Sequence, residues 1–171
     1  MQLANNILYH YNLHYFSKKN NNMNLLLHLI LELASLFALF WIFRTRQIFP
    51  AFVSAAMIIS IILVLYPRIQ NYFDGLYIYM TACLLAFMYG VYKLRNGNLP
   101  ALIIMGSSAS ILLYWLWVIN HWHGNTLIFP AITLIIGGVA ILSRARVKNE
   151  LGFLVILIAD AITIILEEML K

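Results

Sequence analysis

The sequence predicts an all-α integral membrane protein, a polytopic bundle of about six transmembrane helices joined by short loops. Of its 171 residues, 63% are hydrophobic and only 10% are charged, against roughly 45 to 50% and about 25% in soluble domains. A chain this short could not bury so much apolar surface in water, whereas a bilayer solvates apolar side chains that face outward. The apolar residues also fall into stretches near the ~20 residues that cross ~30 Å of hydrocarbon.

Short polar segments separate the six apolar stretches. They contain the Pro, Gly, Asn and charged residues that end helices, and none is long enough to form a domain. The fifth stretch is the shortest, and the C-terminus would move to the other side of the membrane if that stretch did not cross it. We expect helices over residues 24 to 43, 48 to 66, 73 to 93, 99 to 119, 126 to 142 and 151 to 170.

The first 22 residues differ from the rest of the chain. They are polar, rich in Tyr and His, and lack a helical apolar period, so we expect a disordered tail before a single domain over residues 23 to 171. The apolar run opens directly at Met23 and does not have the pattern of a cleavable signal peptide. We therefore expect the tail to be an upstream extension, with translation starting at Met23.

The basic residues predict an orientation. They are spread between apolar runs rather than gathered on one face, which argues against a nucleic-acid partner. Four of the eleven Lys and Arg fall near the termini and the even connections, and the other seven fall in the first, third and fifth connections. By the positive-inside rule, these three connections face the cytoplasm and both termini face outward. The seven are Arg44, Arg46, Lys93, Arg95, Arg144, Arg146 and Lys148.

One turn carries a resemblance to a known family. Residues 117 to 126, with the sequence WVINHWHGNT, lead into an apolar stretch that contains Gly137 and Gly138. This hairpin, over about residues 115 to 142, resembles that of the inner-membrane motor subunit of gliding motility and type IX secretion, and of small uncharacterised membrane proteins. Two residues of the family's pattern are missing. Val118 stands where the family has a lysine in the turn, and the position of the family's motor carboxylate corresponds to about Ile141. The resemblance therefore implies a shared hairpin in a bacterial inner membrane, without motor function.

Ionisable side chains inside apolar runs are candidates for function, because each costs at least about 2.5 to 3.5 kcal/mol at the bilayer centre. His28 and Glu32 lie one turn apart in the first run, and Asp160, Thr163 and Glu167 share a stripe in the last. If these two helices pack together, the five residues would form a polar column from the outer surface to mid-membrane. Such a column could conduct protons or bind cations, or it could be a static hydrogen-bonded cluster that joins the helices.

Histidines in the predicted outer turn raise the question of a metal site. His121 and His123 are two residues apart in this turn, but this spacing is poor for a metal ion without a neighbouring Cys or carboxylate. We interpret them as part of an interfacial anchor with the neighbouring Trp side chains. No metal and no cofactor is expected.

Small residues in the fourth and fifth runs indicate helix packing. The serines of the fourth run resemble the nucleophile loops of intramembrane serine proteases, but Ser108 has no activating histidine in that family's order. We expect these residues to let helices approach closely and the serines to hydrogen-bond across helices. The set is Gly106, Ser107, Ser108, Ser110, Gly137 and Gly138.

Together these features favour a non-catalytic membrane protein that serves as a subunit or assembly factor of a larger membrane complex. The short loops and the lack of a soluble domain support this hypothesis. Its expected partners are the lipid bilayer and either other membrane subunits or a second copy. The alternatives are a small proton- or cation-coupled carrier or channel that uses Glu32 and Asp160 and, third, an intramembrane enzyme.

Overall fold

The computed structural model describes residues 21–65, 72–98, 100–142 and 147–169, and all regular structure in these ranges is helical. The bounds agree with the expected helices to within three residues at each end. The first helix begins at Asn21, so two residues of the expected polar tail are helical, and residues 1–20 lie outside the described ranges. The elements are α2 (Asn21–Arg44), α3 (Ile48–Leu65), α4 (Tyr72–Arg95), α5 (Ala101–Ile119), α6 (Ile128–Leu142), the 3₁₀ turn η1 (Lys148–Glu150) and α7 (Leu151–Met169).

Five of these helices are long and apolar enough to cross a membrane: α2, α3, α4, α5 and α7. The remaining helix, α6, has 15 residues, so it extends about 22 Å and falls short of ~30 Å of hydrocarbon. The expected weakness of the fifth apolar stretch is therefore visible as a short helix. Six helices are present in the described ranges, and five of them have the length of a membrane span.

Polar turns end the helices where the sequence changes character. Gly97 follows α4 with a positive φ of 79°, and its amide donates to the Leu94 carbonyl at 2.9 Å. This left-handed cap is the usual role of a glycine after a helix. The turn between α5 and α6 contains a second positive-φ glycine, Gly124, and also His121, which has a φ of 51°.

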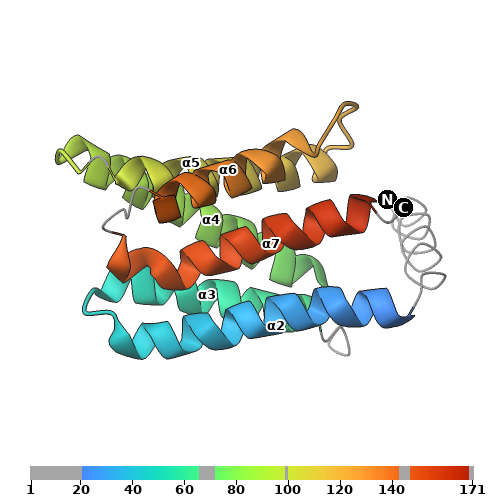
Figure 1. Ribbon diagram of the computed structural model, residues 1–171, viewed down its shortest axis with the longest axis horizontal. Coiled ribbons are helices and arrows are strands. Elements are labelled where there is room, and N and C mark those ends of the chain that lie inside the picture. Colours follow the sequence, from blue (N-terminus) through green and yellow to red (C-terminus); the bar gives the residue numbers. More distant parts are fainter. Residues whose placement is uncertain (1–20, 66–71, 99, 143–146, 170–171) are drawn as a thin grey trace.

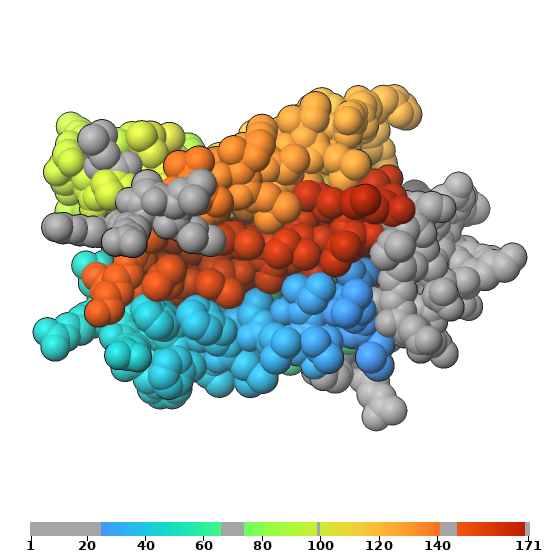
Figure 2. Space-filling view, viewed as in Figure 1, coloured from blue at the N-terminus to red at the C-terminus, as the bar shows by residue number. Residues whose placement is uncertain are grey.

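The central element of the bundle is α7. It packs against α2, α3, α5 and α6, and in Figures 1 and 2 it lies between α2 on one side and α6 on the other. In the most apolar 18-residue stretch of each span, 61% of the residues are buried in the span that contains α7, against 11% in α2. The core therefore surrounds α7, while α2 forms an exposed edge of the bundle.

Small residues bring several helices into close contact. A Cβ at Gly106 would meet the Ile136 side chain at 2.7 Å, and one at Gly137 would meet Ile158 at 2.9 Å, whereas Gly138 has nothing within 4 Å. The first two glycines therefore lie where α5 meets α6 and where α6 meets α7. The expected close approach at Gly138 is wrong.

The serines of α5 are buried, but the expected bonding across helices is wrong for Ser108. Its hydroxyl donates to the Ile104 carbonyl in the same helix at 2.7 Å, a common way for a serine to satisfy its hydroxyl within its own helix. Ser107 is 1% exposed, and its buried hydroxyl oxygen has no hydrogen-bond partner. Ser110 is also buried. Their common property is small size where helices meet.

The closest contact of a glycine with the backbone of another helix gives a stability prediction. A Cβ at Gly90 would lie 2.8 Å from the Met105 backbone nitrogen and 3.0 Å from its Cα. Backbone atoms cannot rotate away, so Gly90→Ala must push α4 and α5 apart. We expect a loss on the order of 1 to 3 kcal/mol, the usual effect of overpacking, seen as a lower midpoint of thermal unfolding in detergent.

The matched control is Gly138→Ala, because the added methyl group meets open space within the same kind of helix. Alanine there should leave stability unchanged or raise it by about 0.5 to 1 kcal/mol, since glycine is unfavourable inside helices. Equal midpoints for the two variants would contradict the close approach of α4 and α5.

Candidate functional site

A buried carboxyl lies at the centre of the bundle. Asp160 is 7% exposed and lies nine residues after the start of α7, about 14 Å along the helix. Its Oδ2 accepts a hydrogen bond from the Tyr79 hydroxyl of α4 at 2.9 Å and from the Trp115 indole of α5 at 3.2 Å. The Thr163 hydroxyl donates to the Asp160 carbonyl oxygen at 2.8 Å. The Asp160 side chain thus joins α7 to two other helices.

The predicted polar column is divided in the structure. The helices α2 and α7 do pack together, as the column required, and Asp160 and Thr163 are buried. His28, Glu32 and Glu167 are instead exposed. Both of the donors to Asp160 come from α4 and α5 rather than from α2. The expected single column is therefore replaced by a buried cluster around Asp160 and exposed ionisable residues on α2 and at the end of α7.

A second polar cluster lies at the end of the bundle that holds the first and third connections. Glu150 of η1 is 1% exposed and forms an ion pair with Lys93 of α4, whose side chain is 18% exposed. The Tyr89 hydroxyl lies 3.3 Å from Glu150 Oε1 and 2.7 Å from Gln47 Oε1. The Tyr89 hydroxyl therefore connects Gln47 with the ion pair.

Side chains at the end of α2 position this second cluster. The Trp41 indole donates to the Lys148 carbonyl at 2.7 Å, and the Thr45 hydroxyl donates to the Asn149 carbonyl at 3.1 Å. These bonds satisfy two carbonyl groups of η1 and hold the turn against α2. Glu150 is thereby directed inward toward Lys93.

Glu150 is not among the residues predicted from the sequence to be functional, and Lys93 is predicted only to contribute to the membrane topology. A signal was present, because Glu150 is one of six acidic residues and directly precedes an apolar run. The alternating topology also places the start of that run at the same end of the bundle as Lys93. The pairing itself joins residues 57 positions apart, and no local pattern predicts it.

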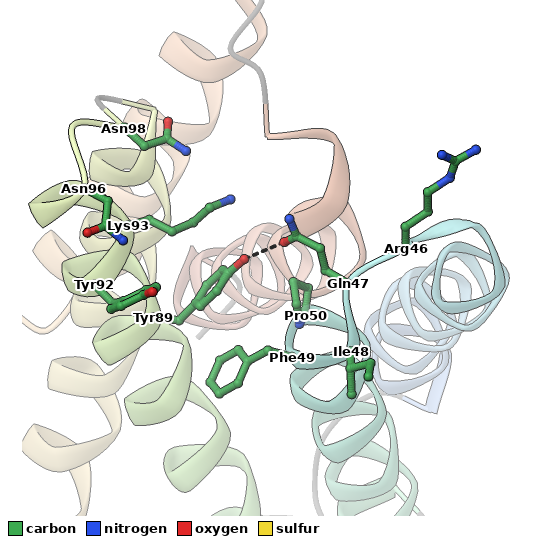
Figure 3. Close-up of a pocket in the computed structure, with 10 residues that line it drawn as sticks. All are labelled: Arg46, Gln47, Ile48, Phe49, Pro50, Tyr89, Tyr92, Lys93, Asn96 and Asn98. Carbon is green, nitrogen blue, oxygen red and sulfur yellow. Dashed lines mark hydrogen bonds between the residues drawn. The ribbon is translucent and has the colours of Figure 1, made fainter.

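An open pocket of about 590 Å³ lies beside the second cluster (Figure 3). Its walls come from the connection between α2 and α3, the first turn of α3, the last turns of α4 and the residues after it. In Figure 3, Lys93 and Tyr89 extend toward Gln47, and the Arg46 guanidinium points outward from the rim. The lining contains Arg46, Gln47, Ile48, Phe49, Pro50, Tyr89, Tyr92, Lys93, Asn96 and Asn98.

The candidate histidines lie on the surface of the α5–α6 turn. His121 and His123 are exposed, and no group of three His, Cys, Asp or Glu in the described ranges is placed to hold a metal ion. The turn is built from aromatic contacts instead. The Trp117 ring packs against Trp122 with centroids 5.1 Å apart and against Phe129 at 5.7 Å.

Comparisons with known proteins identify no relative. No protein-family model, curated protein or solved structure matches the chain. The resemblance of the hairpin over residues 115 to 142 to the motor subunit family stays a prediction from the sequence.

Proposed function

We propose that this chain is a non-catalytic membrane protein that acts as a subunit or accessory factor of a larger membrane complex and contacts its partner through α2. The observation that carries this proposal is the position of Glu32 and His28. Both are exposed on α2, and Glu32 lies seven residues inside the apolar span that begins at Leu25, about 10 Å along the helix.

Large apolar side chains are also exposed on α2. On the same face, Leu29, Leu33 and Leu36 are 45%, 58% and 62% exposed. An ionisable group at this depth costs at least about 2.5 to 3.5 kcal/mol when it faces lipid. A helix packed on this face would shield the carboxyl and the exposed leucines together, because close packing and polar contacts hold membrane helices together. This face of α2 is therefore best explained as a contact surface for another membrane helix.

The partner that fits this face is a transmembrane helix of a different protein carrying a hydroxyl, amide or basic side chain. A second copy of this chain also carries a basic side chain, His28, on the exposed face of α2. Self-association is the alternative outcome of the experiment.

Photo-crosslinking in native membranes tests the proposal. A photoreactive residue at Leu36, which is 62% exposed on α2, should give an adduct with a second protein, whereas one at Ile135, which is 66% exposed on α6, should not. Glu32→Leu should reduce the amount of partner that co-purifies about threefold or more, which is the effect of losing a typical hydrogen bond between membrane helices. Equal adducts from both positions, or a lone monomer after mild solubilisation, would contradict a partner at α2.

The buried carboxyl Asp160 favours a second candidate, a proton- or cation-coupled carrier or channel that uses Glu32 and Asp160. Its membrane-embedded position is the kind that coupling groups occupy. However, Asp160 is held by Tyr79 and Trp115, and Glu32 is on the exposed face of α2. If this candidate is right, Asp160→Asn abolishes pH-dependent flux in proteoliposomes; unchanged flux excludes Asp160 as the coupling group.

The same proposal includes a location. We infer a bacterial inner membrane, with the connections after α2, α4 and α6 in the cytoplasm. The contacts of Trp41 with Lys148 and of Lys93 with Glu150 support this arrangement, because they bring these three connections to one end of the bundle (Figure 1). A membrane-impermeant thiol reagent tests the orientation in intact cells. It should modify a single cysteine that replaces His123, and it should not modify one that replaces Arg95.

A further inference from the structure

The open pocket at the end of α4 combines positive charge with hydrogen-bond donors. Two cations line it, Arg46 and Lys93, and no acidic residue is among its described lining residues. The Lys93 ammonium has three donors. Glu150 accepts a hydrogen bond from this ammonium and offsets part of the positive charge from behind the pocket. Arg46 adds a second positive charge at the rim.

The start of α3 strengthens the attraction for an anion. The helix begins at Ile48, and Ile48, Phe49 and Pro50 all line the pocket. Pro50 has no amide hydrogen, so the free amides at this helix start are those of Ile48 and Phe49, and the macrodipole makes this end partly positive. A helix start is therefore a favourable place for phosphate. Here it acts together with Lys93 and Arg46.

One side of the pocket is aromatic. The Phe49 and Tyr89 rings are stacked with centroids 4.8 Å apart, and Tyr92 is 64% exposed beside them. One turn deeper on the same two helices, Phe52 and Met88 are 59% and 57% exposed. An anion carried by an apolar tail can therefore contact the cations with its head and the exposed surface of α3 and α4 with its chains.

We propose that this pocket binds the phosphate head group of an anionic phospholipid. Basic pockets between transmembrane helices are the sites where such head groups bind. The Lys93 ammonium forms a charge-assisted hydrogen bond to a phosphate oxygen, the Arg46 guanidinium attracts the anion from the rim, and the amides of Asn96 and Asn98 contact the head group. This site is separate from the partner surface on α2, so either proposal can fail alone.

Native mass spectrometry of the full chain in detergent micelles tests this site, with phosphatidylglycerol, phosphatidylcholine and inorganic phosphate as separate probes. Phosphatidylglycerol should remain bound in preference to phosphatidylcholine. Arg46→Gln should weaken its binding about fivefold, the usual effect of one basic residue near anionic lipid. Binding of inorganic phosphate with the same affinity would show a site for the free anion and overturn the lipid assignment.

Two further variants separate binding from folding. Lys93→Gln combined with Glu150→Gln removes both charges without leaving one buried alone, and it should also weaken phosphatidylglycerol binding, because the ammonium that donates to the phosphate is lost. The matched control is Arg95→Gln, an exposed arginine at the end of α4 that does not line the pocket, and it should bind the lipid as the wild-type chain does. Equal losses in Arg46→Gln and Arg95→Gln would overturn the pocket in favour of general surface charge.

Discussion

Lys93→Met is expected to destabilise the chain by about 3 to 5 kcal/mol, because it leaves the Glu150 carboxylate buried without its counter-charge. Glu150 is 1% exposed and its partner cation is Lys93. The Tyr89 hydroxyl remains nearby, but a neutral hydroxyl cannot replace an ammonium charge. Thermal or denaturant unfolding in detergent measures the loss.

The double variant Lys93→Met with Glu150→Leu distinguishes a broken pair from lost packing. Replacing both members of a buried ion pair by apolar side chains is often neutral or stabilising, so the double variant should recover most of the stability. Lys148→Met is the control, because this lysine is exposed two residues from Glu150 and should change stability by no more than about 0.5 kcal/mol. A single variant as stable as the wild type would contradict the ion pair.

Asp160→Leu is expected to be the other severe change. It removes the acceptor of the buried Tyr79 hydroxyl and of the half-buried Trp115 indole, and an unsatisfied buried donor costs about 1 to 3 kcal/mol. Asp160→Asn keeps one side-chain oxygen as an acceptor, so it should lose much less stability. Unfolding midpoints of the two variants in the same detergent test this difference.

Tyr79→Phe in the Asp160→Leu background checks the mechanism. It removes one of the two stranded donors, so the double variant should be more stable than Asp160→Leu alone. If Tyr79→Phe instead lowers the stability of Asp160→Leu further, the Tyr79 hydroxyl does not need Asp160 as its hydrogen-bond acceptor. The unfolding midpoint of Asp160→Asn also shows whether this variant is folded well enough for a flux measurement.

The number, order and bounds of the helices followed from the sequence because these properties are local. Each apolar run is interrupted by residues that end helices, such as Gly97 after α4, and the interruption is visible without knowledge of neighbours. The shortness of α6 was visible in the same way. Hydropathy therefore locates helices well, but it does not determine which of their faces meet.

The partners of the polar residues could not be predicted for that reason. Asp160 was identified as a buried carboxyl inside an apolar run, but its donors are 81 and 45 residues away in sequence, and Tyr and Trp are ordinary residues of membrane helices. Glu150 was overlooked because it lies in a charged connection, where an acidic residue normally faces water. Its burial depends on α2 holding η1 in place, which is a tertiary contact.

The central position of α7 has a consequence for biogenesis. Proteins are made from the N-terminus, so α2 to α6 are synthesised and enter the bilayer before the helix around which they pack. Until α7 arrives, the Tyr79 hydroxyl, the Trp115 indole and the Lys93 ammonium lack the carboxylates that they contact in the finished bundle. The last two elements, η1 and α7, therefore complete both polar clusters, and an intermediate that stalls before them presents unmatched polar groups to the insertion machinery and to membrane proteases.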